Sequence, residues 1–150
     1  MTKNWGPSIW YFFHSLAEKI TDAGYLILKK EVCNIISHVC FHLPCIECTK
    51  HAKEYIGKHG LNPNILNTKE KLKEYLFTFH NAVNSRLGKP QFTDYDKYKT
   101  ANMNAIYQNF KIYYFKYNEP TRGFIDTMAR ERIIRMADSF FISNHKYFIN

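Results

Sequence analysis

Apolar side chains recur three or four residues apart along most of this chain, which is the pattern of helices that bury one face. We expect a turn at residues 22–24 and breaks at Pro44 and at residues 88–90. The chain therefore has an all-α fold, a small helical bundle followed by a helical extension. The predicted helices cover residues 7–20, 25–42, 45–57, 68–87, 93–117 and 121–145.

Composition excludes several classes of protein. Hydrophobic residues make up 45% of the 150 residues, so the chain is not disordered, and no apolar run reaches the ~18 residues of a membrane span. The first residues lack a small-residue cleavage site, which favours an intracellular protein without a membrane partner. The net charge of +8 comes from lysines scattered among acids, so we expect a solvated surface and no specific nucleic-acid partner.

All four cysteines lie within 16 residues, which favours one local site over a disulfide scaffold. Cys45 and Cys48 form a Cys-x-x-Cys pair just after a proline. Cys33 and Cys40 are about 10.5 Å apart along one helix, too far for a disulfide. We therefore expect two buried thiols there, or else a relay role or an intersubunit bond for Cys40.

Three interpretations of the Cys-x-x-Cys pair stay open at this point. In the first turn of a helix, the dipole favours a thiolate at Cys45, and the pair can close an exchangeable disulfide. Zinc ligation would use Cys45, Cys48 and His51 with Cys40 or another histidine, but the second ligand pair typical of zinc sites is missing. The pair can also serve packing alone.

Polar side chains occupy positions where a helix would be expected to bury apolar ones. Trp10 and His14 are four residues apart and share one helical face. A second stripe contains His80, Asn81 and Asn84, with Phe77 and Leu87 at the same spacing. Such a stripe is either a hydrogen-bonded core network or a binding surface for a flat ligand with polar edges.

Three segments together resemble one family. "WGPSIWYFFH", "LPCIECTKH" and "FHNAVNSRLGKPQF" follow one another in the order seen in the Erv/ALR family of FAD-linked sulfhydryl oxidases. The resemblance covers about residues 4–98. The short format, without a second Cys-x-x-Cys, is similar to the viral branch of that family.

The resemblance implies four helices and a short fifth around FAD in a domain of residues 1–118, with residues 119–150 as the C-terminal extension. It implies that Cys45 and Cys48 form the active-site disulfide and that no metal is bound. An aromatic after the Lys-Pro element, Tyr95 or Tyr98, would stack on the adenine. The residues implied to bind FAD are Trp5, Gly6, Pro7, Trp10, His14, His51, Phe77, His80, Asn81, Val83, Asn84, Leu87, Lys89 and Tyr98.

By the same resemblance, a protein dithiol, expected on a thioredoxin-like carrier, attacks Cys45, and electrons pass from Cys48 through FAD to O₂, giving H₂O₂. A homodimer is expected on the first two helices, with Ile9, Phe13, Leu28 and Ile35 available for the interface. A viral member would work in the host cytoplasm and in the virion.

Two questions stay open at this point. The alternative function is a zinc-stabilised basic helical module that binds partners without catalysis. The extension is expected to cover the bundle surface, or else to contact a partner.

Overall fold

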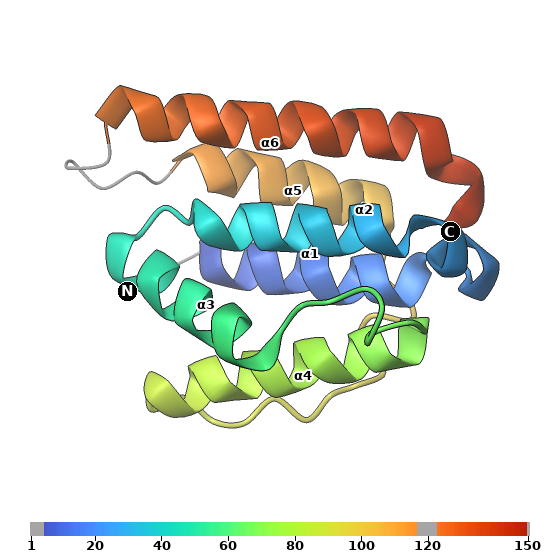
Figure 1. The fold of residues 1–150 in the computed structure, drawn as a ribbon, viewed down its shortest axis with the longest axis horizontal. Helices are drawn as coiled ribbons and strands as arrows, with labels where there is room; N and C mark the ends of the chain where they lie inside the picture. The colour runs from blue at the N-terminus through green and yellow to red at the C-terminus, as the bar shows by residue number, and fades with distance from the viewer. Residues whose placement is uncertain (1–4, 117–122, 150) are drawn as a thin grey trace.

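The computed structural model describes residues 5–116 and 123–149 (Figure 1). Within these residues the chain forms six α-helices, a final 3-10 turn and no β-strand beyond a single isolated bridge, which confirms the all-α prediction. None of the described helices is both long and apolar enough to cross a bilayer. The elements are α1 (Trp5–Lys19), α2 (Asp22–Phe41), α3 (Ile46–His59), α4 (Lys69–Arg86), α5 (Met103–Lys116), α6 (Gly123–Asn144) and η1 (His145–Tyr147).

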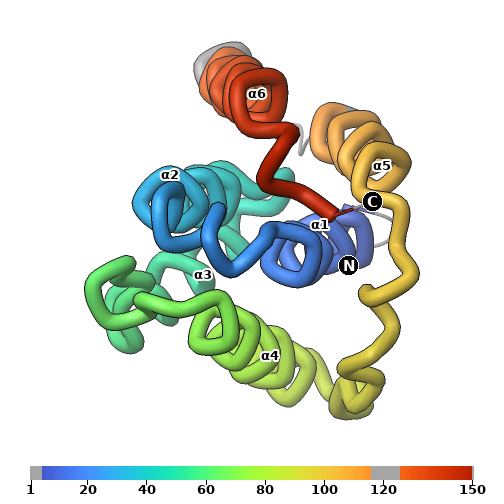
Figure 2. The backbone as a smooth tube through the Cα atoms, turned by 90° about the vertical axis from the view of Figure 1, so that its right-hand side faces the viewer, coloured from blue at the N-terminus to red at the C-terminus, as the bar shows by residue number. Residues whose placement is uncertain are grey.

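The helices stack in three layers of two (Figure 2). α1 and α2 run antiparallel in the middle, α3 and α4 cover one side, and α5 and α6 cover the other. α1 contacts both α4 and α5, whereas α2 contacts both α3 and α6. Four chain segments therefore meet at one end of the molecule: the start of α1, the end of α2, the start of α3 and the end of α4 (Figure 1).

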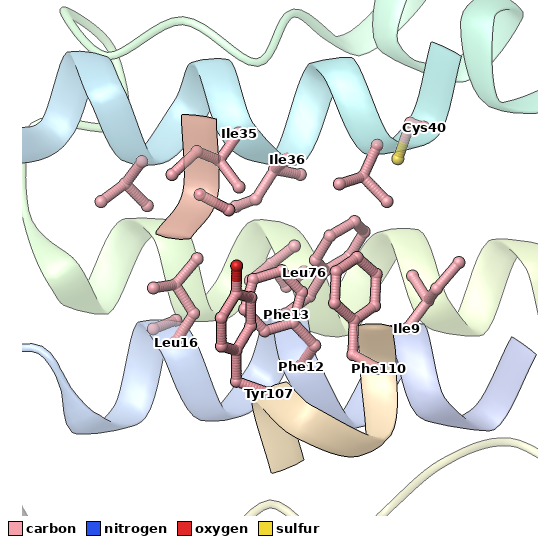
Figure 3. Close-up of a cluster of buried hydrophobic side chains, with 14 of the residues drawn as sticks. Ile9, Phe12, Phe13, Leu16, Ile35, Ile36, Cys40, Leu76, Tyr107 and Phe110 are labelled. Carbon is pink, nitrogen blue, oxygen red and sulfur yellow. The ribbon is translucent and has the colours of Figure 1, made fainter. Parts of the chain in front are cut away.

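The core lies between these layers, and side chains from α1, α2, α4 and α5 meet in it (Figure 3). Phe12 is fully buried and stacks on Phe110 of α5, with ring centroids 4.3 Å apart. Full burial of one such side chain stabilises the fold by ~1.5–3 kcal/mol. The residues labelled in Figure 3 are Ile9, Phe12, Phe13, Leu16, Ile35, Ile36, Cys40, Leu76, Tyr107 and Phe110.

The four apolar positions considered for a dimer interface all belong to this core. Ile9, Phe13, Leu28 and Ile35 are each at most 7% exposed in a single chain. α4, α5 and α6 cover the faces of α1 and α2 on which these side chains would have to meet a second copy. A dimer would therefore have to use another surface.

Two predicted boundaries are wrong, and both errors come from capping residues that were not recognised. Residues 22–24 are not a turn, because α2 begins at Asp22 and the Thr21 hydroxyl caps it, accepting a hydrogen bond from the backbone N–H of Gly24 at 2.9 Å. The helix expected over residues 93–117 begins at Met103. Asn102 precedes it and accepts a hydrogen bond from the backbone N–H of Ala105 at 3.0 Å.

The C-terminal extension covers the bundle, as one of its two interpretations predicted. α6 packs on α2 and α5, and the chain then returns to the α1–α2 turn. There the N–H of Thr21 donates to the Tyr147 carbonyl, and the N–H of Ile149 donates to the Lys19 carbonyl, both at 2.7 Å. The predicted domain boundary at residue 118 lies outside the described residues.

Candidate active site

Cys45 and Cys48 are joined by a disulfide at the start of α3. Cys45 is the N-cap of the helix rather than part of its first turn, with extended backbone angles after Pro44. Its sulfur accepts a hydrogen bond from the backbone N–H of Cys48 at 3.2 Å. The Thr49 hydroxyl accepts a hydrogen bond from the backbone N–H of Leu43 at 3.1 Å and donates one to the Cys45 carbonyl at 3.0 Å. These two bonds connect the turn before Cys45 to α3.

A cavity of about 240 Å³ lies beside this disulfide, and Cys48 is part of its wall whereas Cys45 is not. The wall comes from the start of α1, the end of α2, α3, the end of α4 and the segment after α4. Segments far apart in the sequence thus form one site because their helix ends lie together (Figure 1). The predicted FAD-binding residues on this wall are Trp5, Gly6, Pro7, Trp10, His51, His80, Val83, Asn84, Leu87, Lys89 and Tyr98.

Three predicted FAD-binding residues, His14, Phe77 and Asn81, do not line the cavity. Asn81 instead holds the segment after α4: its Nδ2 donates to the Phe92 carbonyl at 3.1 Å, and its Oδ1 accepts from the Phe92 N–H at 2.6 Å. Asn84 lines the cavity but also donates from Nδ2 to the Pro90 carbonyl at 3.1 Å. The amides of the polar stripe therefore bind the backbone of residues 90–92 and do not form a core network, while His80 and Asn84 also line the cavity.

Aromatic rings stack next to the cavity. Trp10 and His80 are nearly parallel, with centroids 4.3 Å apart, and both contribute to the wall. Behind them the buried His14 ring stacks on Phe77 at 4.9 Å and on Tyr98 at 4.8 Å. His14 and Phe77 thus support residues of the wall. Of the two tyrosines considered for adenine contact, Tyr98 is buried at the cavity, and Tyr95 is exposed and absent from its wall.

His80 in the cavity wall and His14 behind it are neutral at pH 7. Nε2 of His14 lies 2.9 Å from Nδ1 of His80, so one ring must donate the hydrogen bond and the other accept it. Burial lowers the pKa of His14 to about 3, and the neighbouring His80 and Lys97 act in the same direction. Burial, Lys89 and Lys97 lower the pKa of His80 to about 4.

His51 lies on α3 between two carboxylates. Its Nε2 is 3.6 Å from Glu47, and its Nδ1 is 3.7 Å from Glu54. These acids are one helical turn away on either side, the spacing at which helical side chains meet. His51 is therefore oriented by its own helix while it contributes to the cavity wall.

Sequence reasoning missed ten residues of the wall. Cys40 was not predicted because only the tertiary fold brings the end of α2 to the cavity, whereas Leu43 adjoins the Cys-x-x-Cys pair and could have been found from its place in that motif. Phe92 and Lys97 lie in a segment that was partly expected to be helix, although an aromatic and lysines after the Lys-Pro element were a usable signal. The missed residues are Ile9, Tyr11, Phe13, Cys40, Leu43, Ala52, Phe79, Arg86, Phe92 and Lys97.

Cys33 and Cys40 are buried free thiols, as expected. Burial raises the pKa of Cys33 to about 11 and raises that of Cys40 as well. Zinc binding finds no support, because Cys45 and Cys48 are joined to each other and no group of three or more metal-ligating side chains forms within the residues described.

The lining of the cavity fits a flat aromatic group joined to phosphates. Its walls are mostly apolar and include the rings of Trp10, His80 and Tyr98. Three cationic side chains, Arg86, Lys89 and Lys97, also reach it. Cationic side chains are the usual partners of phosphate groups, and aromatic rings are the usual partners of flat heterocycles.

Comparisons with known proteins give the same family as the motifs. The sequence model of the Erv1 / Alr family matches residues 7–104. The chain is 35% identical over 103 residues to the FAD-linked sulfhydryl oxidase of African swine fever virus, an alignment covering 69% of this chain and 83% of that protein.

Two further relatives are similar over a shorter part of the chain. Protein 096R of Invertebrate iridescent virus 3 is 37% identical over 89 residues, which is 59% of this chain and 60% of the viral protein. The mitochondrial FAD-linked sulfhydryl oxidase erv1 of Schizosaccharomyces pombe is 29% identical over 87 residues, 58% of this chain and 47% of that protein. The matched region, residues 7–104, includes every residue of the cavity wall except Trp5 and Gly6, and the chain belongs to the Erv1 / Alr family.

Proposed function

We propose that this protein is an FAD-dependent sulfhydryl oxidase that makes disulfide bonds in protein dithiols. One observation carries the proposal: Cys48, half of an N-cap disulfide, forms part of the wall of an aromatic cavity with three cationic side chains. A disulfide at a helix start is exchangeable because the positive end of the helix stabilises the thiolate that is released.

The two cysteines have different roles because only Cys48 belongs to the cavity wall. A substrate thiolate attacks the Cys45 sulfur, so that a substrate–Cys45 bond forms, the Cys45–Cys48 bond breaks and Cys48 leaves as a thiolate. The second substrate thiolate then attacks the substrate sulfur of this mixed disulfide, and Cys45 leaves as a thiolate. The substrate gains a disulfide, and the enzyme pair is reduced by two electrons.

Bound FAD supplies the two-electron acceptor for the reduced cysteine pair and the route to O₂, which becomes H₂O₂. Trp10 and His80 provide flat walls, and Tyr98 is the aromatic available for the adenine. The cationic side chains of Arg86, Lys89 and Lys97 neutralise the pyrophosphate.

The substrate meets Cys45 directly, because the other two cysteines of this sequence, Cys33 and Cys40, are buried free thiols. Ile46, 44% exposed beside the disulfide, offers an apolar contact to an incoming protein. We propose a thioredoxin-like carrier as that protein. Because two of the relatives are viral proteins, we propose the host cytoplasm and the virion as the places where the protein acts. A homodimer stays a prediction. Measuring the molecular mass of the protein in solution and comparing it with the 17.9 kDa of one chain would test it.

The test combines a spectrum with a turnover assay. The protein purified with FAD should show a flavin spectrum, and it should consume O₂ and release H₂O₂ when given dithiothreitol or a reduced thioredoxin-like protein. Cys48→Ser should keep the flavin spectrum and lose turnover, whereas Cys33→Ala, which changes a cysteine outside the cavity wall, should keep both. A colourless protein, or a Cys48→Ser variant with normal turnover, contradicts the proposal.

A further inference from the structure

We propose that α5 and α6 position the active-site disulfide through three residues, Tyr114, Asp126 and Arg130, which together hold the last turn of α2. This inference rests on the proposed function, because it assigns these residues a role in delivering Cys48 to the cavity. All three lie beyond residues 7–104, the part of the chain that matches the family. We call them the α2 clamp.

The first contact of the α2 clamp is made by α5. The hydroxyl of Tyr114 donates a hydrogen bond to the carbonyl of Val39 at 3.3 Å, and this tyrosine is fully buried. The same carbonyl accepts the backbone N–H of His42 at 3.2 Å, the bond that ends α2. α5 therefore supports the turn at which the chain leaves α2.

The second contact comes from α6. Arg130 is 1% exposed, forms an ion pair with Asp126 one helical turn earlier, and lies 5.9 Å from the centre of the Tyr114 ring. Oδ1 of Asp126 lies 3.7 Å from Nδ1 of His42. A series of contacts thus connects Val39 to α5, α5 to α6, and α6 to His42, which lies three residues before Cys45.

The segment held in this way leads directly into the site. Cys40 and Leu43, on either side of the clamped turn, both line the cavity, and Pro44 and Cys45 follow at once. A buried ion pair adds little net stability compared with apolar side chains of similar size, because both charges lose their hydration. What the pair supplies here is position: Arg130 holds Oδ2 of Asp126, and Oδ1 of the same carboxylate then lies beside His42.

Loosening the α2 clamp should therefore affect catalysis more than folding. The disulfide is anchored on one side by α3 and on the other by residues 42–44. If this turn moves, Cys48 is displaced relative to the cavity, and small displacements of reacting groups cost about tenfold to a hundredfold in rate.

Two variants loosen the clamp without leaving a buried charge unpaired. Tyr114→Phe removes only the hydroxyl, and Asp126→Leu combined with Arg130→Met replaces the ion pair by apolar side chains. Phe140→Leu is the matched control, because Phe140 is buried on α6 and packs against Phe141 and Phe148, away from His42. Each variant is measured as the full chain with FAD.

We expect both clamp variants to lower kcat for dithiol oxidation by about tenfold with KM changed by less than about twofold. Amide exchange in a peptide covering residues 39–46 should become faster, and the reduction potential of the Cys45–Cys48 pair against glutathione should shift. Phe140→Leu should lower the Tm but leave kcat, the amide exchange of residues 39–46 and the reduction potential unchanged. Clamp variants with wild-type kcat and exchange, or a control that reproduces their effects, overturn the inference. Absence of thiol oxidation by the wild type would instead refute the proposed function, while exchange and potential still test the clamp.

Discussion

His14 of α1 and His80 of α4 share one hydrogen bond, with Nε2 of the first 2.9 Å from Nδ1 of the second. Only a pair with a single proton between the two facing nitrogens can make this bond. Burial keeps both rings neutral by lowering the pKa of each, to about 3 and about 4. The pair links the first and fourth helices at the cavity, with His80 in the wall and His14 behind it.

This pair predicts a stability that falls in mild acid. The folded-state pKa of His14, about 3, lies below the ordinary value of 6.5, so between these values the unfolded chain binds the proton and the folded chain does not. The contribution of neutral His14 to the free energy of unfolding is complete above pH ~6.5. It is lost as the pH falls, at up to ~1.4 kcal/mol per pH unit for this group. Urea unfolding at pH 7 and pH 5 measures it. His14→Gln should reduce the dependence to the part that His80 contributes, whereas His38→Gln, at an exposed position, should leave it unchanged. Equal slopes in all three proteins would refute the prediction.

Lys97 is predicted to contribute to FAD affinity. It lines the cavity and lies 4.5 Å from the centre of the Tyr11 ring, which holds its side chain in place. Loss of one charged hydrogen bond to phosphate, in Lys97→Met, should raise the Kd for FAD by about tenfold. Fluorescence titration of the FAD-depleted protein measures the Kd. Lys50→Met, an exposed change on α3 away from the wall, should leave it unaltered, and an unaltered Kd in Lys97→Met would exclude this role.

Two glycines in helices should respond oppositely to alanine. At Gly24 an added Cβ would lie 2.6 Å from Cβ of Tyr147, where the C-terminal segment crosses α2. Gly24→Ala should therefore destabilise the fold by ~1–3 kcal/mol through overpacking. At Gly57 nothing lies within 4 Å, so Gly57→Ala should stabilise α3 by ~0.5–1 kcal/mol. Thermal unfolding compares the two, and a Gly24→Ala protein as stable as wild type would contradict the packing of residue 147 on α2.

The two free thiols should be inert in the folded protein. Cys33 and Cys40 are buried, and burial raises the pKa of both thiols, so little of the reactive thiolate forms at neutral pH. Iodoacetamide added to the dithiothreitol-reduced protein should label Cys45 and Cys48 first, as read by peptide mass spectrometry. Urea should expose the other two. Labelling of Cys40 in the native state at the rate of Cys45 would show that the end of α2 is open.

The periodic helices were predictable because their buried faces leave a pattern in the sequence. Helix ends were less predictable. α2 and α5 begin where Thr21 and Asn102 cap them, and a cap depends on one hydrogen bond that the residue type alone does not guarantee. The motif residues were found because they lie close together in the chain. Cys40 and Lys97, which lie outside the motifs, were missed because only the packing of α2 and of the segment after α4 brings them to the cavity.

The sequence alone determined an all-helical chain, the pair of cysteines that form the disulfide and the family to which the chain belongs, since helical periodicity and short motifs are local properties. Tertiary structure decided which members of the polar stripe face the cavity and which, like Asn81, hold a loop. It also decided that Ile9, Phe13, Leu28 and Ile35 belong to the core, and that α6 brings Asp126 to His42. These outcomes depend on which helices lie next to each other, and burial and contact between distant segments exist only once the helices have packed.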